Sequence, residues 1–250
     1  MNAQALNPVM VLPAVGLAPG RVTGVVHRID YPMVWTSGRR DAKDVLALPA
    51  RWWPPTHGLP TGVRAVILEG LPPSRDLHVA VPVVGDVDLD LLREGETVEV
   101  DGSSGTIAID GVEEVAVVTA FLERTDGRIL LLERSSKVGS FPGRWAAVSG
   151  YLEDQPPLDQ AYREVREELG IGPDDLVLRS HGATVMARDG ARIYLVAPFR
   201  FELRTTTTLK LNWEAVRAEW VRPEEIPLRT TVPKLDRTWK AVAPAIAPKA

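Results

Sequence analysis

The sequence has no cysteine, which excludes disulfide bonds, thiolate zinc sites and a cysteine nucleophile. Any bound metal must therefore be held by carboxylate, carbonyl or imidazole groups. No run of 18 apolar residues is present, so we do not expect the chain to span a membrane. Basic residues are not in excess either, because Lys and Arg total 29 and Asp and Glu total 33. Neither nucleic acid nor a membrane is therefore expected as a partner.

The first 20 residues are apolar, but we do not expect them to form a secretion signal. They lack a basic start, and Pro8, Pro13 and Pro19 interrupt them. We expect a loose or strand-like lead-in and a cytoplasmic protein. A chain of 250 residues has room for one large domain or two ordinary ones.

Residues 1–112 are predicted to form a β-rich N-terminal domain. Segments 21–29, 63–70 and 77–84 are rich in β-branched residues, and 97–110 reads as a hairpin whose turn starts at Asp101-Gly102. Residues 35–60 mix turn residues with one short helix, and the Trp-Trp-Pro-Pro run at 52–55 is expected to form a packed corner.

The end of this region resembles a known class of domain. The run VPVV followed by LREGETVEVDGSSGTIAI is similar to the swivelling β/β/α domains of phosphoenolpyruvate-utilising enzymes and small dehydratase subunits, over about residues 20–112. The reactive histidine loop of the phosphotransfer members is not identifiable here. The resemblance therefore implies a fold and no activity.

The segment 143–171 contains the clearest helix of the chain. A proline pair at 156–157 stands where a helix can start, and Gly170 stands where one can end. Apolar side chains between them recur at helical spacing and form one stripe: Leu158, Ala161, Tyr162, Val165 and Leu169.

Three carboxylates crowd one side of this helix. At about 100° per residue, Glu164, Glu167 and Glu168 fall within an arc of roughly 100°. They must repel one another and titrate together, and a divalent cation would relieve the crowding. Oxygen ligands without a local histidine favour Mg²⁺ or Mn²⁺ over zinc. Taken alone, however, the same string of residues also suits a solvated amphipathic helix.

The flanking residues make the segment similar to the Nudix box. That motif is a Gly, five residues, Glu, seven residues, then Arg-Glu-apolar-x-Glu-Glu-x-Gly-apolar. Residues 163–171 fit its second half without a mismatch, and Gly150 supplies the opening glycine. Two departures exist: the spacing from Gly150 to Arg163 is one residue short, and Gln155 replaces the first glutamate when the gap is placed just before it. Glu153 and Asp154 are nearby carboxylates that could substitute for it.

The resemblance to the Nudix family extends over about residues 113–250. A hairpin at 115–134, strands within 176–203 and the phrase WEAVRAEWVRPEEI follow the family's order. Glu214, six residues before Trp220, matches a family glutamate on a loop that reaches over the helix. The resemblance implies a C-terminal Nudix domain of residues 113–250, an α/β/α sandwich around a mixed sheet. The whole chain is then of the mixed α/β (α+β) class, with the smaller β-rich domain first.

The resemblance also implies an activity and a site. The activity is Mg²⁺-dependent (Mn²⁺ possible) hydrolysis of a pyrophosphate bond in a nucleoside diphosphate linked to another moiety. The alternative is a non-catalytic Nudix module that senses a nucleotide-like ligand. The implied metal ligands are Glu164, Glu167, Glu168 and the carbonyl of Gly150. The implied catalytic residues are Glu164 and Glu214, as alternative proton acceptors, and Arg163, which orients a carboxylate.

Substrate contacts can be suggested from residue type alone. Phosphate contacts are suggested at Arg134, Lys137, Arg144 and Arg188, and ring-stacking contacts at Phe141, Trp145 and Tyr151; of these, Arg134, Arg144 and Tyr151 are the candidate substrate-binding residues. The C-terminal segment 232–248 reads as an amphipathic helix that packs either on the sheet or on a second subunit, which leaves a homodimer open.

Overall fold

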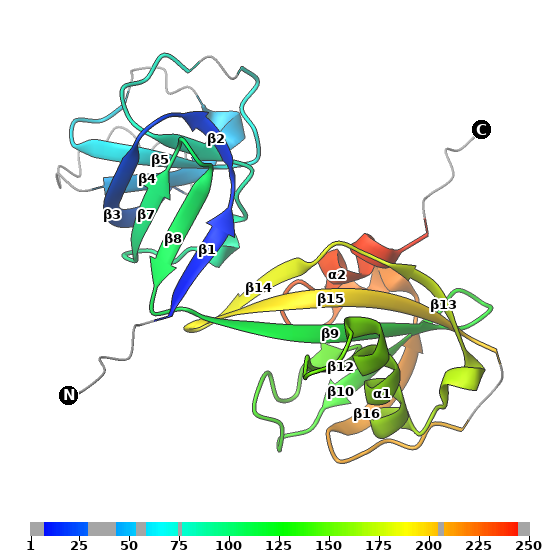
Figure 1. Ribbon diagram of the computed structural model, residues 1–250. Coiled ribbons are helices and arrows are strands. Elements are labelled where there is room, and N and C mark those ends of the chain that lie inside the picture. The colour runs from blue at the N-terminus through cyan, green and yellow to red at the C-terminus, as the bar shows by residue number, and fades with distance from the viewer. Residues whose placement is uncertain (1–7, 30–43, 54–58, 75–76, 205–207, 245–250) are drawn as a thin grey trace, which may run out of the picture. The chain divides into compact units, whose positions relative to one another are not determined.

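The computed structural model describes residues 8–29, 44–53, 59–74, 77–204 and 208–244. The chain divides into two compact units (Figure 1). Unit 1 comprises Met1–Glu113 with Gly190–Arg192, and unit 2 comprises Glu114–Asp189 with Ile193–Ala250. Among these described residues, no helix has the length and apolar character needed to cross a membrane. The cytoplasmic location stays a prediction.

Unit 1 is built on one eight-stranded sheet with the strand order β1-β8-β7-β3-β4-β5-β6-β2. Its strands are β1 Val9–Pro13, β2 Val15–Ala18, β3 Arg21–Arg28, β4 Asp44–Pro49, β5 Val63–Glu69, β6 Val83–Gly85, β7 Thr97–Asp101 and β8 Thr106–Asp110. Two 3-10 turns, η2 Ala50–Trp52 and η3 Leu89–Leu91, are the helical elements among the described residues of this unit. The β-rich prediction is confirmed, whereas the swivelling β/β/α resemblance and residues 1–112 as a separate domain stay predictions.

Strand β4 corrects the expectation for residues 35–60. It runs parallel to both β3 and β5, and its residues Val45, Ala47 and Leu48 are fully buried. A central parallel strand is a short apolar run in which polar and apolar residues do not alternate. Its sequence period therefore does not distinguish a strand from a short buried helix. Much of the segment in which the short helix was expected, and the proline end of the packed corner, lie outside the described residues. Of the strand expected at 77–84, only its last two residues belong to β6.

The hairpin of β7 and β8 is confirmed, and Asp101 closes it. Its carboxylate accepts hydrogen bonds from the backbone N–H groups of Ser103 and Ser104 and from the guanidinium of Arg21. These donors favour the charged form, and the hydrogen bond from Arg21 does most to hold the pKa of Asp101 below its ordinary value.

Gly102→Ala in this turn is expected to destabilise the protein. A Cβ there would lie 1.9 Å from the carbonyl oxygen of Ala18, a backbone atom that cannot move aside. We expect a loss of about 1–3 kcal/mol in the free energy of unfolding, as for other overpacked sites. Urea denaturation measures it, with Asp110→Asn at the exposed end of β8 as the control, expected within about 0.5 kcal/mol of wild type. Equal midpoints for the two variants would contradict the assigned close contact.

Unit 2 contains the second mixed sheet. Its strands follow the order β11-β10-β9-β15-β13, with β12 paired to β9, β14 to β15 and β16 to β10. The elements are β9 Glu113–Glu123, β10 Ile129–Arg134, β11 Trp145–Ala146, β12 Val148–Tyr151, α1 Pro157–Leu169, η4 Pro173–Asp175, β13 Leu176–His181, β14 Val185–Asp189, β15 Arg192–Leu203, β16 Ala215–Val221, η5 Pro223–Leu228 and α2 Leu235–Val242.

The two α-helices of unit 2 cover opposite faces of this sheet. Successive strand residues point to opposite faces. Leu122 of β9 therefore packs in one buried cluster with Val165 of α1, while Phe121 packs in another with Trp239 of α2. The rings of Phe121 and Trp239 meet edge to face, with 5.2 Å between their centroids. The α/β/α sandwich is confirmed, and α2 packs on the sheet. A homodimer stays a prediction.

Helix α1 begins and ends where the sequence predicts. Pro157 is its first residue, and Gly170 follows it in the left-handed conformation with φ of 70°. Ala161 and Val165 of the predicted stripe are fully buried. One polar side chain, that of Gln160, is fully buried beside them, although its type does not mark it as a core residue.

Candidate active site

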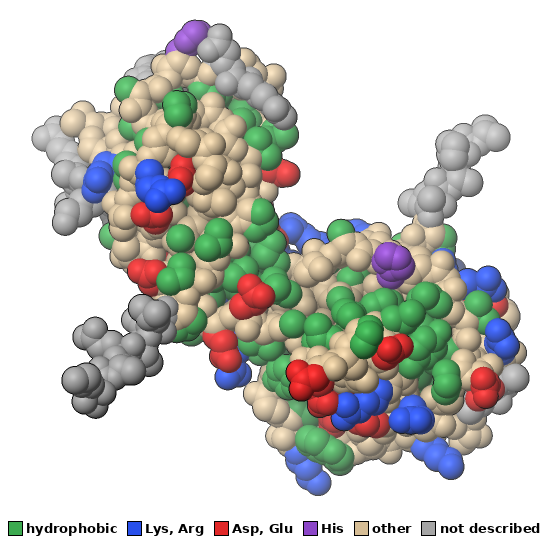
Figure 2. Space-filling model, viewed as in Figure 1, with side chains coloured by type: hydrophobic (Ala, Val, Ile, Leu, Met, Phe, Trp, Pro, Cys, Tyr) green, Lys and Arg blue, Asp and Glu red, His purple; other side chains and the backbone are tan. Residues whose placement is uncertain are grey.

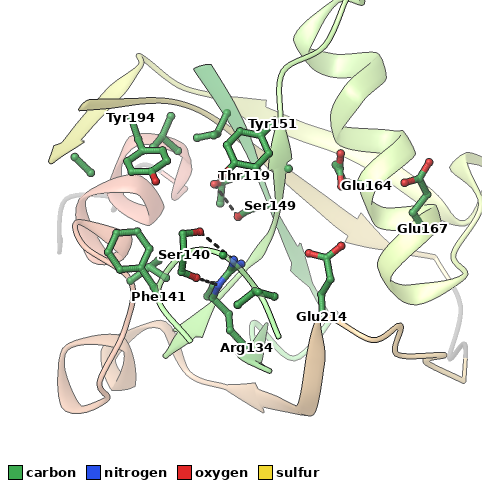
Figure 3. A pocket seen from close by; sticks show the side chains of 18 of the residues that line it. Thr119, Arg134, Ser140, Phe141, Ser149, Tyr151, Glu164, Glu167, Tyr194 and Glu214 are labelled. Atoms are coloured by element: carbon green, nitrogen blue, oxygen red, sulfur yellow. Dashed lines mark hydrogen bonds between the residues drawn. The ribbon is translucent and has the colours of Figure 1, made fainter. Parts of the chain in front are cut away.

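A pocket of about 380 Å³ lies within unit 2 and has two chemically different ends. Figure 3 shows the carboxylates of Glu164, Glu167 and Glu214 gathered at one end. At the other end are the rings of Phe141 and Tyr194, whose centroids are 6.1 Å apart. The pocket can therefore take a ligand with a charged part and a planar apolar part.

Glu164 is half-buried in a slot between helix and strand. A Cβ on Gly150 of β12 would lie 2.0 Å from the carboxyl carbon of Glu164, so the carboxylate occupies the space that this glycine leaves. The amide of Gln160 donates a hydrogen bond to Oε1 of Glu164. Burial raises the pKa of Glu164, the charges of Glu167 and Glu214 raise it further, and the Gln160 hydrogen bond opposes the shift.

Arg163 lies between two carboxylates on the exposed side of α1. Its Nε donates to Glu167 at 2.7 Å, and its Nη1 donates to Glu153 at 2.5 Å. Figure 2 shows acidic and basic side chains side by side over this part of unit 2. Glu153, one of the two carboxylates suggested as substitutes for the first glutamate of the motif, thus forms an ion pair with Arg163, while the amide of Gln155 donates to Gln160. The orienting contact predicted for Arg163 is made to Glu167.

Glu168 is only 5% exposed and does not line the pocket. Its carboxylate accepts a hydrogen bond of 3.0 Å from the backbone N–H of Ser149 on β12. Burial raises the pKa of Glu168 to about 8, and the charges of Glu214 and Glu164 add to this, while the Ser149 hydrogen bond opposes it.

Glu214 comes over the helix from the loop before β16, as expected. Backbone hydrogen bonds from Lys210 to Leu169 and from Asn212 to Glu168 tie this loop to the end of α1. The side chain of Asn212 also accepts from the backbone N–H of Glu214. These contacts bring Glu214 into the same pocket as Glu164 and Glu167.

The family model of the NUDIX domain matches residues 113–242. The chain belongs to the Nudix family. A zebrafish (Danio rerio) protein named m7GpppN-mRNA hydrolase NUDT17 is 35% identical over 68 residues, which are 26% of this chain. The matched stretch covers only 23% of that relative's own length.

Solved Nudix-type structures are similar to about half of this chain. The MutT protein of Methanosarcina mazei is 24% identical over 52% of this chain and 92% of its own, with a TM-score of 0.44. A C. elegans Ap4A hydrolase is 19% identical over 51% of this chain and 93% of its own, with a TM-score of 0.45. By themselves these likenesses say nothing of the substrate of this chain.

Nudix hydrolases generally use divalent metal ions, and the donor set here suits one. The carboxylates of Glu164, Glu167 and Glu168 are hard oxygen donors. Burial raises the pKa of Glu164 and of Glu168, and the charges of neighbouring carboxylates raise both further. They do not converge, since no three His, Asp or Glu side chains in the described ranges could together hold a metal ion. Each of the three has its own hydrogen-bond partner, which is Gln160 for Glu164, Arg163 for Glu167 and the Ser149 backbone N–H for Glu168.

The predicted substrate contacts of this Nudix domain divide into two groups. Arg134 lines the pocket between its two ends, where Nε and Nη2 donate to Ser140, and Tyr151 lines it with 55% of its surface exposed. Phe141 also lines it. Arg144 does not; its guanidinium donates to the backbone carbonyl of Thr231. Three further suggested contacts are likewise absent from the lining: Lys137, Trp145 and Arg188.

Four groups of the pocket were not found from the sequence. Tyr194 and the hydrogen-bonded hydroxyls of Thr119 and Ser149 come from strands whose neighbours only the sheet order decides. Trp213, 59% exposed at the pocket, directly precedes Glu214 and could have been suspected. Gln160 does not line the pocket but hydrogen-bonds to Glu164. It could have been found from the sequence, because it lies four residues before Glu164 on one helix face.

Proposed function

We propose that this Nudix domain is a divalent-metal-dependent pyrophosphohydrolase acting on a nucleoside diphosphate linked to another moiety. The observation that carries the proposal is the pocket itself, with three carboxylates at one end and an aromatic pair at the other. The acidic end alone would repel phosphate groups, because both carry negative charge. A cation between the carboxylates and the phosphates would turn this repulsion into attraction.

The chemistry follows from the charge of the substrate. A pyrophosphate is a polyanion, and its hydrolysis needs charge neutralisation and a placed water. Mg²⁺, or Mn²⁺, bound by Glu164, Glu167, Glu168 and the carbonyl of Gly150 would supply that neutralisation and lower the pKa of the attacking water. Arg163 orients the carboxylate of Glu167 through a charge-assisted hydrogen bond.

Glu214 and Glu164 remain the two candidates for the group that takes the proton from water. Both line the pocket, and the charge of Glu214 adds to the burial that raises the pKa of Glu164. Glu214→Gln separates them: lost turnover with unchanged Mn²⁺ affinity would assign the base to Glu214. Unchanged turnover in that variant would assign it to Glu164.

The aromatic end of the pocket indicates what the part of the substrate away from the pyrophosphate is. Phe141 and Tyr194 offer faces and edges on which a planar base can pack. Arg134, positioned by Ser140, offers a cation to a phosphate group between the two ends. The zebrafish relative, which is named as a hydrolase of m7GpppN-mRNA, supports a nucleotide-type substrate.

A non-catalytic ligand-sensing module is the second candidate. It is favoured by one observation, that no three His, Asp or Glu side chains among the described residues, Glu164, Glu167 and Glu168 included, converge on one point where a metal ion could bind. A panel of nucleoside triphosphates, sugar nucleotides, dinucleotides and coenzymes separates the two. Release of phosphate or nucleoside monophosphate with Mg²⁺, abolished by EDTA, is expected of the enzyme. Ligand-induced thermal stabilisation without turnover across the whole panel would establish the sensor instead.

A further inference from the structure

Two glutamine side chains form a hydrogen-bonded line that ends on Glu164. Nε2 of Gln155 donates to Oε1 of Gln160, and Nε2 of Gln160 donates to Oε1 of Glu164, each at 2.5 Å. Gln160 is fully buried, and its side-chain amide lies between these two hydrogen-bond partners. The two partners therefore decide its orientation.

The line has a direction because an amide has one donating and one accepting end. Gln160 can present its NH₂ to Glu164 only while its carbonyl meets another donor, and the amide of Gln155 supplies that donor. A carboxylate at position 155 would only accept. It would draw the NH₂ of Gln160 toward itself and turn the Gln160 carbonyl against the Glu164 carboxylate, two acceptors face to face.

We propose that Gln155 and Gln160 are positioning residues that fix the carboxylate of Glu164 for metal binding. The inference rests on the proposed function. The amide of Gln160 holds one oxygen of the carboxylate, and the side-chain-free face of Gly150 holds the group from another side. Arg163 has carboxylate partners in Glu153 and Glu167, so the side chain of Gln155 is left to hydrogen-bond with Gln160. Gln155, which departs from the Nudix box, thus helps to orient the metal-binding carboxylate of Glu164 through Gln160.

The test measures Mn²⁺ binding to the full chain without substrate, by the electron paramagnetic resonance signal of free Mn²⁺. Gln160→Met removes both amide contacts at similar volume, and we expect Mn²⁺ affinity about 10–100-fold weaker, the usual effect of losing a partner of a metal ligand. Gln155→Glu, which restores the residue of the motif, is expected to weaken Mn²⁺ binding to a similar extent.

The sign of the Gln155→Glu effect separates this inference from simple electrostatics. An added negative charge near a cation site should by itself tighten Mn²⁺ binding, whereas a reversed Gln160 amide weakens it. In the Gln160→Met background the Gln155→Glu change should cause no further loss, since the amide it acts through is gone. Asp174→Asn, which changes an exposed carboxylate of η4 that does not line the pocket, is the control and should leave Mn²⁺ affinity unchanged.

Two further measurements separate positioning from folding. Thermal unfolding temperatures of the variants without metal should lie close to that of wild type, and kcat should fall more than KM rises. Tighter or unchanged Mn²⁺ binding by Gln155→Glu, or losses that simply add in the double variant, would overturn the inference while leaving the proposed function intact. A wild-type protein that binds no Mn²⁺ would overturn the proposed function, and this inference with it.

Discussion

Turnover is expected to fall about 100-fold or more when Glu168 is replaced by Gln, and by a similar factor for Glu167→Gln. Both changes remove a negative charge that would bind a cation, and both keep the size of the side chain. Steady-state rates with saturating Mg²⁺ on the best substrate of the panel measure the effect. Turnover within a few-fold of wild type in either variant would remove that residue from the proposed metal site.

Stability should separate these two variants. The pKa of Glu168 is raised to about 8 in the folded protein, whereas an unfolded Glu titrates near its ordinary value of 4.5. The stability that the protonated group contributes is therefore fully present below about pH 4.5 and is lost as pH rises through about 8. Metal-free wild type should thus lose stability between these values, by on the order of a few kcal/mol.

Glu168→Gln should lack this loss, because Gln stays neutral and its carbonyl can still accept from Ser149. Denaturation in EDTA at pH 5 and pH 8 measures the difference. Glu167, whose side chain is half exposed, should show no comparable effect, and Glu167→Gln serves as the matched control. An identical fall for wild type and Glu168→Gln would show that the buried carboxyl is not the group responsible.

Gly150→Ala is expected to lower kcat about 100-fold while the fold is retained. The new Cβ would lie 2.0 Å from Cδ and 2.1 Å from Oε1 of Glu164, so the carboxylate must leave its slot. The obstacle is the mobile end of a side chain, and the φ angle of Gly150 lies outside the left-handed region, so the backbone tolerates alanine. Turnover and Mn²⁺ affinity should therefore fall together, with a thermal unfolding temperature near that of wild type.

Gly172→Ala is the matched control for Gly150→Ala. A Cβ at Gly172 would meet nothing within 4 Å, its φ is not in the left-handed region, and it does not line the pocket. Rates for this variant should equal those of wild type. Normal turnover in Gly150→Ala would mean that Glu164 does not act from its slot beside β12.

The sequence predicted those features that short stretches of chain encode. The bounds of α1 follow from Pro157 and Gly170, which start and end a helix by their own backbone preferences. The buried stripe and the places of Glu167 toward solvent and Glu168 toward the core follow from helical periodicity. The Asp101 turn follows from turn chemistry in the same way.

Features that depend on distant segments were decided only by the tertiary structure. Strand β4 was missed because a central parallel strand has no alternation to read. The aromatic end of the pocket needs Tyr194 and Phe141 side by side, although they lie far apart in the sequence.

The separate partners of the three carboxylates likewise come from packing. The sequence places Glu164, Glu167 and Glu168 on one helix. Packing of this helix against β12 then gives Glu168 a hydrogen bond from the Ser149 backbone and places Glu164 against Gly150. Secondary-structure propensity acts over a few neighbouring residues. The site, in contrast, combines side chains from distant segments, which lie close together only in the folded sheet.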